Sequence, residues 1–194
     1  VDLYLHSLTK YAGGHGDVMG GAVIGNRELI DPIRADAITI GPTLDPHAAF
    51  LLLRGMKTYF LRYRRQCESA LAVGRWLEAH PRVSELRHPG LASHPQHDLA
   101  ARQMSDFGAV LSFVLRGGPG ADLRLIDRLR LFRFAGSLGS TESLVAPAHR
   151  FFAGDLTREQ ALRAGLPENT IRLSVGIEDP ADLIADLEQA LEDE

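Results

Sequence analysis

The sequence feature that most constrains the fold is a short β-prone run that ends in two hydroxyls and one amine. Apolar and polar-capable residues alternate over residues 1 to 6, so this segment is predicted to form a strand. Ser7, Thr9 and Lys10 follow at the end of that strand. Two hydroxyls spaced two apart can point at one anion such as a phosphate, and a lysine amine that loses its proton can carry covalent chemistry.

A glycine-rich segment comes directly after the lysine. The pairs Gly13-Gly14 and Gly20-Gly21 allow the backbone to turn tightly and to approach a ligand closely. Taken alone, a lysine beside Ser and Thr is usually a solvated surface residue, and paired glycines usually make ordinary turns. On these residues alone the structural interpretation is favoured over a functional one.

The longer string changes that interpretation. The chain contains the string Ser7-x-Thr9-Lys10-Tyr11-x-x-Gly14-His15-x-Asp17-x-x-x-Gly21. This string resembles the pyridoxal-phosphate lysine signature of the trans-sulfuration enzymes, the Cys/Met metabolism family. Further blocks that are similar to the family, in the family's order, lie at 54–58, 88–91, 137–144 and 171–179. Gly16 and Ser140 depart from the family's usual residues, but neither departure affects the lysine or the arginine of the match.

The resemblance implies a cofactor and the residues that hold it. The cofactor is pyridoxal 5'-phosphate, Lys10 is the catalytic lysine that binds it covalently, and Ser7 and Thr9 hold its phosphate. Pyridoxal phosphate does the difficult electronic work in such enzymes, while the protein positions and tunes it. His15 and Asp17, two residues apart in the glycine-rich loop, are interpreted as fixing the loop that carries Lys10 rather than as a catalytic dyad.

The resemblance also implies a substrate site. Arg172 lies in an otherwise apolar strand, where its residue type alone favours a structural pairing; by resemblance it is the arginine that binds the substrate carboxylate with a bidentate fork. Ser137 resembles the residue whose backbone helps to hold the same carboxylate. Gly136 is expected to set specificity, because it leaves empty the space near the distal part of the substrate. Glu142 is interpreted as a brace for its loop.

Composition excludes several classes of protein. The 194 residues are 45% hydrophobic with a net charge of −4, which suits a globular chain and gives no basic excess for a nucleic-acid partner. The single cysteine, Cys67, and the absence of a long apolar run predict a reducing, cytoplasmic location without a membrane span. The pair His94 and His97 flanks Pro95 and lacks a third ligand, so no metal site is expected.

The predicted organisation is α/β. Residues 1–62 are expected to be the end of a large cofactor domain of the fold-type I pyridoxal-phosphate enzymes, whose N-terminal portion is expected to be missing. Residues 63–194 are expected to form a C-terminal α/β sandwich domain. An apolar stripe at helical spacing predicts one long helix over about 46–79 that joins the two. Gly21–Gly25 is predicted to be a second, buried strand, residues 37–44 a loop, and Asp45 the N-cap of the long helix. Cys67 lies on the apolar stripe and is interpreted as a buried structural residue. Strand and helix patterns alternate in the rest, and the last helix is predicted to begin at Asp179-Pro180.

The function implied by the resemblance is carbon–sulfur lyase chemistry or γ-replacement on small amino acids such as cystathionine, activated homoserine or methionine. Family members assemble as dimers or tetramers, so a homo-oligomer is expected. One alternative is an aminotransferase or decarboxylase of the same fold. Another is a non-catalytic fragment that folds and dimerises without turning over substrate.

Residues 1–194 alone are expected to be catalytically silent. In the family, the aromatic ring that stacks on the cofactor and the aspartate that pairs with its pyridine nitrogen lie upstream of this lysine, so the chain supplies only part of a pocket. The purified chain would be mixed with pyridoxal phosphate and cystathionine, and the release of keto acid or thiol measured. Sustained turnover of about 1 per second or faster, an ordinary enzyme rate, would contradict this expectation.

Overall fold

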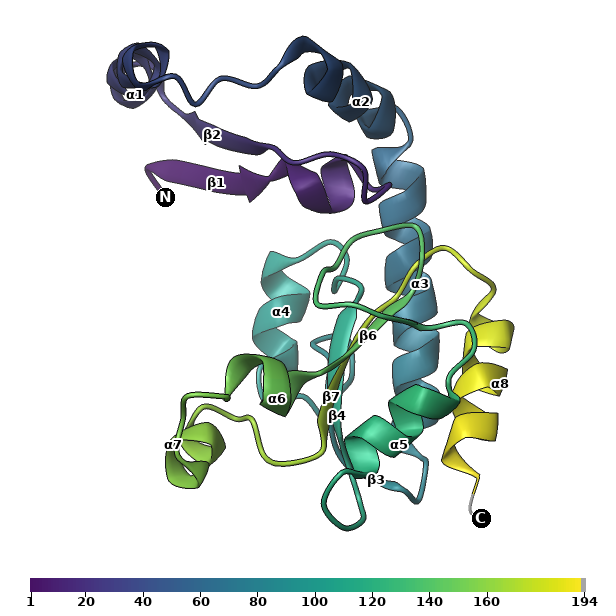
Figure 1. Cartoon of the computed structure of the whole chain (residues 1–194). Helices are drawn as coiled ribbons and strands as arrows, with labels where there is room; N and C mark the ends of the chain where they lie inside the picture. The colour runs from purple at the N-terminus through teal and green to yellow at the C-terminus, as the bar shows by residue number, and fades with distance from the viewer. Residues whose placement is uncertain (193–194) are drawn as a thin grey trace. The chain divides into compact units, whose positions relative to one another are not determined.

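A β-hairpin forms the first part of the chain in the computed structural model, which describes residues 1–192 (Figure 1). Strand β1 (Leu3–Ser7) pairs antiparallel with β2 (Gly21–Gly25), and a helical turn over Leu8–Ala12, η1, lies between them in sequence. The predicted positions of both strands are confirmed. The expectation that Gly21–Gly25 is buried is wrong: most of β2 is exposed, because the described hairpin has only two strands.

Two helices complete this part of the chain. Helix α1 (Arg27–Ile40) begins after Asn26, whose side chain accepts a hydrogen bond from the Leu29 amide, and it ends at Gly41 with a φ of 94°. A loop was expected from residue 37, but the helix continues to Ile40. The β-branched residues there are accommodated in part because the Thr39 hydroxyl bonds to the carbonyl of the preceding turn.

The single helix predicted over about 46–79 is in fact two helices. Helix α2 (Pro46–Met56) begins after the predicted N-cap Asp45, and helix α3 (Tyr59–Glu78) ends near the predicted position. Between them, the Thr58 amide and hydroxyl both bond to the Gly55 carbonyl at 3.3 Å, which tightens and ends the first helix. The apolar stripe does not reveal the break, because a two-residue turn barely disturbs its spacing.

Contacts between residues divide the chain into two units, Val1–Phe60 and a second that begins at Leu61. The second unit contains a five-stranded sheet in which all pairs are antiparallel except β5 with β6. The strands, in their order across the sheet, are β3 (Val83–Arg87), β4 (Val110–Leu115), β7 (Thr170–Ser174), β6 (Leu144–Pro147) and β5 (Arg133–Phe134).

Helices pack on this sheet to form the core. Helices α3, α5 (Ala121–Arg128) and α8 (Pro180–Leu191) lie on one side, whereas α4 (His97–Gln103), α6 (Ala148–Phe152) and α7 (Arg158–Arg163) lie toward the other (Figure 1). The largest fully buried apolar side chains come from β4, β7, α3 and α8: Leu111, Phe113, Ile171, Leu173, Leu77, Leu183 and Leu187. The expected α/β architecture and the start of the last helix after Asp179 are confirmed. Within residues 1–192, no helix has the length and hydrophobicity to cross a membrane.

A close backbone contact links α2 to the segment that follows η1. A Cβ atom added to Gly55 would overlap the carbonyl oxygen of Gly13 and would lie 3.0 Å from that of Ala12. Only glycine allows the helix to approach this backbone so closely. The position of α2 therefore depends on the path of the chain just after Lys10.

Replacing Gly55 with alanine is expected to lower the free energy of unfolding by about 1–3 kcal/mol, because the new methyl group would overpack this contact. Helix propensity alone predicts the opposite sign, a gain of about 1 kcal/mol. Gly74→Ala in α3 is the matched control, since its Cβ would make one ordinary contact at 3.7 Å with Leu91. Urea unfolding followed by circular dichroism measures both variants. An unchanged or higher midpoint for Gly55→Ala would contradict the expectation.

Candidate active site

Lys10 lies inside the η1 turn, directly after β1. Its backbone angles, φ −87° and ψ −127°, leave the helical path within Leu8–Ala12. Two main-chain hydrogen bonds of 2.8 Å, from Gly13 to Leu8 and from Gly14 to Lys10, close the turn around it. The lysine is thus held on a short, internally bonded turn rather than on a free loop.

The hydroxyl of Thr9 ties this turn to the returning strand. Its Oγ1 accepts a hydrogen bond from the Gly20 amide at 3.0 Å and donates one to the Gly20 carbonyl at 3.3 Å. A phosphate oxygen needs a donor, so Thr9 could bind one only by redirecting its proton away from Gly20. Ser7 lies at the N-cap position of the turn, and its side chain makes no capping hydrogen bond.

His15 bonds to the main chain of the glycine-rich loop that follows Lys10. Its Nδ1 atom lies 2.7 Å from the Gly13 carbonyl, two residues back, while Asp17 is exposed. A ring nitrogen bonded to the main chain so close in sequence braces the glycine-rich loop. This geometry agrees with the loop-fixing role expected for His15.

A second group of predicted residues meets in the sheet-containing unit. Arg172 donates two hydrogen bonds from Nη2, at 2.8 Å to the carbonyl of Gly136 and at 2.7 Å to that of Ser137. Arg172 lies on the central strand β7, paired with Ser112 of β4 and Ala146 of β6. Its side chain leaves the sheet on the face opposite the buried neighbours of the same strand. The structure thus brings Gly136, Ser137 and Arg172 together.

The carbonyl of Ser137 accepts a bond from the arginine. A carbonyl oxygen is an acceptor and cannot bind a carboxylate, so the main-chain contact with a substrate carboxylate that is expected at Ser137 would have to come from its amide. That contact stays a prediction. In this structure the carbonyls of Gly136 and Ser137 orient the Arg172 guanidinium.

Side chains that the sequence analysis did not single out hold the loop after Ser137. Gln66 of α3 donates to the Ser140 carbonyl at 2.6 Å, and the Ser174 hydroxyl accepts a bond from the Gly139 amide at 3.1 Å. Glu178 accepts from both the amide and the hydroxyl of Ser143, at 2.7 and 2.9 Å. Gln66 is fully buried on α3, while Ser174 and Glu178 lie in the family-like block 171–179, which was the signal that the sequence offered for them.

Glu142 takes the structural role expected for it. The Ser140 hydroxyl donates a short hydrogen bond to the Glu142 carboxylate, two residues on. Such a local bond stabilises the turn between Gly139 and Ser143. The carboxylate therefore braces the loop that leads from the Arg172 contacts to β6.

Cys67 and His88 are buried ionisable side chains of this unit whose pKa values are shifted by burial. Burial raises the pKa of the Cys67 thiol, which disfavours a nucleophilic thiolate and agrees with the expected structural role. Burial also lowers the pKa of His88, whose two ring nitrogens bond to the Gly108 carbonyl and the Gly90 amide. His88 thus fixes the turn of one of the family-like blocks.

The histidine pair near α4 makes turn contacts. His94 accepts a bond from the Gln96 amide at 3.2 Å, and His97 lies 2.8 Å from the Pro89 carbonyl. Over the described part of the chain, no three or more His, Cys, Asp and Glu side chains come together in a way that could hold a metal ion.

Relatives of known activity match the chain along its whole length. It is 44% identical to an L-methionine gamma-lyase of Fusobacterium nucleatum subsp. polymorphum, over 98% of this chain and 49% of the relative. It is also 44% identical to the chloroplastic cystathionine gamma-synthase 1 of Arabidopsis thaliana, over 98% of this chain and 34% of the relative. The chain therefore spans half or less of the length of these relatives.

Solved structures give the same result for the fold. A cystathionine gamma-lyase from Micromonospora echinospora matches with a TM-score of 0.93 and 42% identity, covering 98% of this chain and 50% of that one. A cystathionine gamma-synthase from Xanthomonas oryzae pv. oryzae, solved in complex with cystathionine, matches with a TM-score of 0.93 and 44% identity over the same shares. The fold class expected from the resemblance is confirmed.

The family model for Cys/Met metabolism PLP-dependent enzymes matches residues 1–192. The match includes the lysine turn, the loop at Ser137 and the strand that carries Arg172. The chain therefore belongs to the family of Cys/Met metabolism PLP-dependent enzymes.

Proposed function

We propose that this chain supplies the cofactor lysine and the substrate-carboxylate arginine of a trans-sulfuration enzyme. The reaction would be elimination or replacement at the γ or β carbon of a sulfur-containing or O-activated amino acid, with γ-chemistry as the first choice. The observation that carries the proposal is the family match over residues 1–192 with Lys10 on its bonded turn between two strands.

The local residues fit a phosphate-bearing aldehyde cofactor. Pyridoxal phosphate, when bound, supplies an electron sink for carbanions next to the substrate nitrogen. Lys10 would hold it covalently, and the released amine would move a proton between the α and β carbons of the substrate. Ser7 and Thr9 would donate hydrogen bonds to its phosphate, Thr9 by turning its proton away from the Gly20 carbonyl.

The chain composition sharpens the assignment of Lys10. The 194 residues contain two lysines, Lys10 and Lys57, so within this part of the protein two side-chain amines are candidates for covalent attachment. Lys57 lies at the C-cap of α2, away from any strand end with paired hydroxyls. Because the hydroxyls of Ser7 and Thr9 lie close to it in sequence, Lys10 is the lysine that we assign to covalent attachment of the cofactor.

The substrate carboxylate would be bound by Arg172. The carbonyls of Gly136 and Ser137 orient its guanidinium and accept both hydrogens of Nη2, so a bidentate carboxylate would have to displace at least one of these two bonds. We assign residues 1–62 to the end of the cofactor domain and 63–194 to the C-terminal domain. We also propose that the protein assembles as a homo-oligomer.

Covalent attachment to Lys10 tests the first part of the proposal. The native protein, loaded with pyridoxal phosphate, would be reduced with borohydride and its peptides mapped by mass spectrometry. The phosphopyridoxyl group is expected on the peptide that contains Lys10, and the label is expected to disappear in Lys10→Ala. Lys57→Arg is the matched control and should keep the label. A label found only on another lysine, Lys57 included, would refute the assignment.

Replacing Arg172 with lysine tests the second part. The expected result is a loss of about 2 kcal/mol or more in kcat/KM, roughly 30-fold, for every amino-acid substrate alike, because lysine cannot form the bidentate fork. Arg163→Lys is the control, since Arg163 makes an exposed ion pair with Glu159 on α7. Steady-state kinetics of the native protein measure both variants. Unchanged kinetics for Arg172→Lys would return this residue to a structural pairing.

A further inference from the structure

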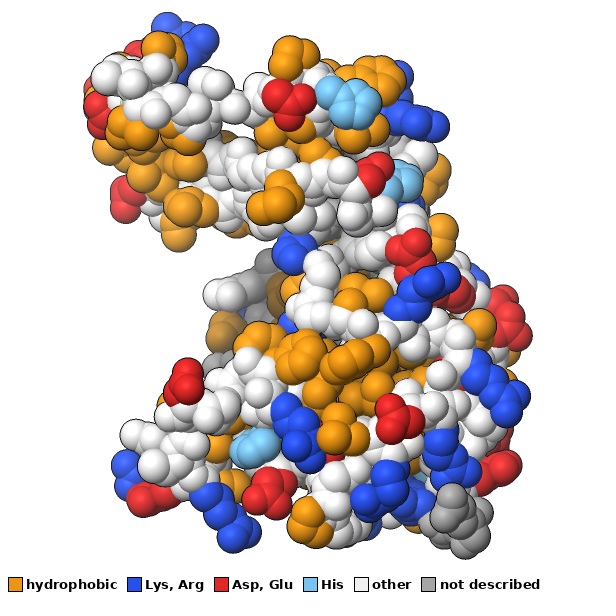
Figure 2. All heavy atoms as spheres, in the orientation of Figure 1, with side chains coloured by type: hydrophobic (Ala, Val, Ile, Leu, Met, Phe, Trp, Pro, Cys, Tyr) orange, Lys and Arg blue, Asp and Glu red, His pale blue; other side chains and the backbone are white. Residues whose placement is uncertain are grey.

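Three phenylalanine rings form a cluster beside Arg172. The ring of Phe152 lies under the guanidinium, with its centroid 5.4 Å from Cζ of Arg172, which is within cation–π range. Phe151 contacts Phe152 in an edge-on arrangement at 6.4 Å and Phe134 of β5 at 5.6 Å. All three rings remain about half exposed, at 51, 45 and 59% for Phe152, Phe151 and Phe134. Figure 2 shows hydrophobic side chains gathered on the face where α6 and β6 lie.

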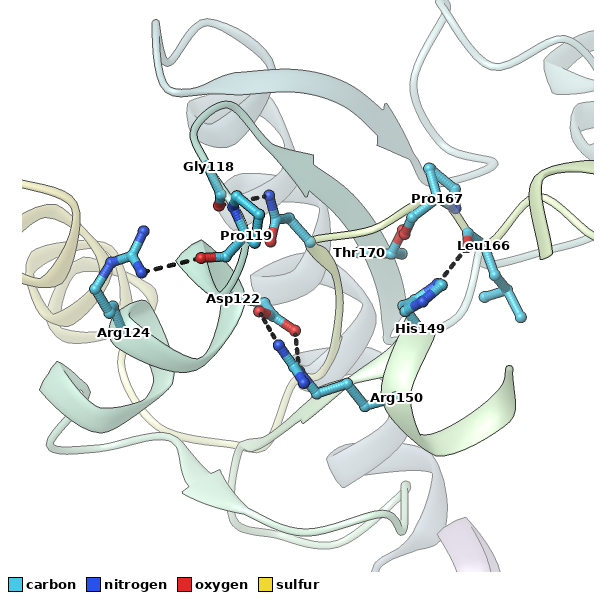
Figure 3. A network of polar contacts seen from close by, with 10 residues as sticks. Gly118, Pro119, Asp122, Arg124, His149, Arg150, Leu166, Pro167 and Thr170 are labelled. Carbon is cyan, nitrogen blue, oxygen red and sulfur yellow. Dashed lines mark hydrogen bonds and ion pairs between the residues drawn. The ribbon is translucent and has the colours of Figure 1, made fainter. Parts of the chain in front are cut away.

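The short helix α6 that carries two of these rings is clamped in place. Arg150 donates to Asp122 of α5 at 3.0 Å, and the Asp122 side chain is only 2% exposed (Figure 3). His149, the preceding residue, bonds to the Leu166 carbonyl at 2.7 Å on the other side of the helix (Figure 3). Two consecutive residues thus fix α6 from two directions, which places the next two side chains, Phe151 and Phe152.

Phe151 fills the space beside Gly136. A Cβ added to Gly136 would lie 3.2 Å from Cε2 of Phe151, so this space is closed by an aromatic ring. The structure thus places an aromatic ring beside Gly136, where empty space was expected. The surface next to Arg172 is therefore apolar, and the Phe151 and Phe152 rings set its contour.

We propose that the cluster Phe134, Phe151 and Phe152 makes this site selective for amino acids with an uncharged, apolar side chain, such as a thioether, with Phe152 also positioning Arg172. This inference rests on the proposed carboxylate role of Arg172. A substrate anchored there would lie within one side-chain length of the rings. An apolar chain would bury against them favourably, whereas a distal charged group would lose hydration without a matching partner.

The positioning role is tested with Phe152→Leu against Phe152→Tyr. The leucine keeps apolar volume but loses the ring face, so KM for methionine is expected to rise roughly three- to tenfold with kcat nearly unchanged. The tyrosine keeps the ring and should retain the native KM. A purely structural role would lower thermal stability without this split between KM and kcat.

A second measurement does not depend on turnover. In the native protein without substrate, the Nε–Hε resonance of Arg172 should carry an upfield ring-current shift that disappears in Phe152→Leu and persists in Phe152→Tyr. If the resonance does not move in the leucine variant, the contact is absent in solution and the inference is overturned. This result is independent of the borohydride test, so failure of the inference and failure of the proposed function can be told apart.

Selectivity is tested with Phe151→Ala in the native protein. Opening the space beside Gly136 is expected to lower the ratio of kcat/KM for methionine to that for cystathionine by roughly tenfold. Phe151→Leu, which keeps most of the volume, should give a smaller change in the same direction, and Leu162→Ala on the exposed side of α7 should give none. An unchanged ratio in both Phe151 variants, or a native protein that prefers cystathionine, would overturn the proposed selectivity.

Discussion

The alternation of side chains along β7 is the constraint on which the second unit depends. Ile171 and Leu173 point into the core and are fully buried, while Arg172 between them leaves the sheet on the opposite face. A slip of one residue in register would bury the guanidinium and expose the two apolar side chains. Because β7 is hydrogen-bonded on both sides, to β4 and β6, such a slip would disrupt two ladders at once. The same packing that stabilises the unit therefore places the arginine.

The loop from Gly136 to Ser143, which holds the two carbonyls bonded to Arg172, is itself fixed to the core. Its amides and carbonyls are bonded to side chains of α3, of β7 and of the segment before α8, mainly Gln66, Ser174 and Glu178. Buried main-chain groups outside regular secondary structure need such partners. As a result, the carbonyls that orient Arg172 are attached to the core through several independent bonds and not through the loop alone.

Much of this could be predicted from the sequence, since periodicity and motifs report local structure. The strand predicted over residues 1 to 6 was found at Leu3–Ser7, and the start of the last helix after Asp179 was predicted correctly. The break between α2 and α3 was missed because it depends on a two-residue turn. The ring beside Gly136 was not predicted, because it comes from a residue brought near only by folding.

The close approach of Gly55 to the backbone after Lys10 has a consequence for how this protein can vary. A glycine inside a helix costs about 1 kcal/mol in intrinsic propensity, so a mutation to alanine would be favoured if the helix stood alone. The carbonyl of Gly13 removes that freedom. Position 55 is therefore restricted to glycine by a main-chain oxygen more than forty positions earlier in the sequence. A substitution there would disturb the backbone just after Lys10, although no side chain of that segment is touched.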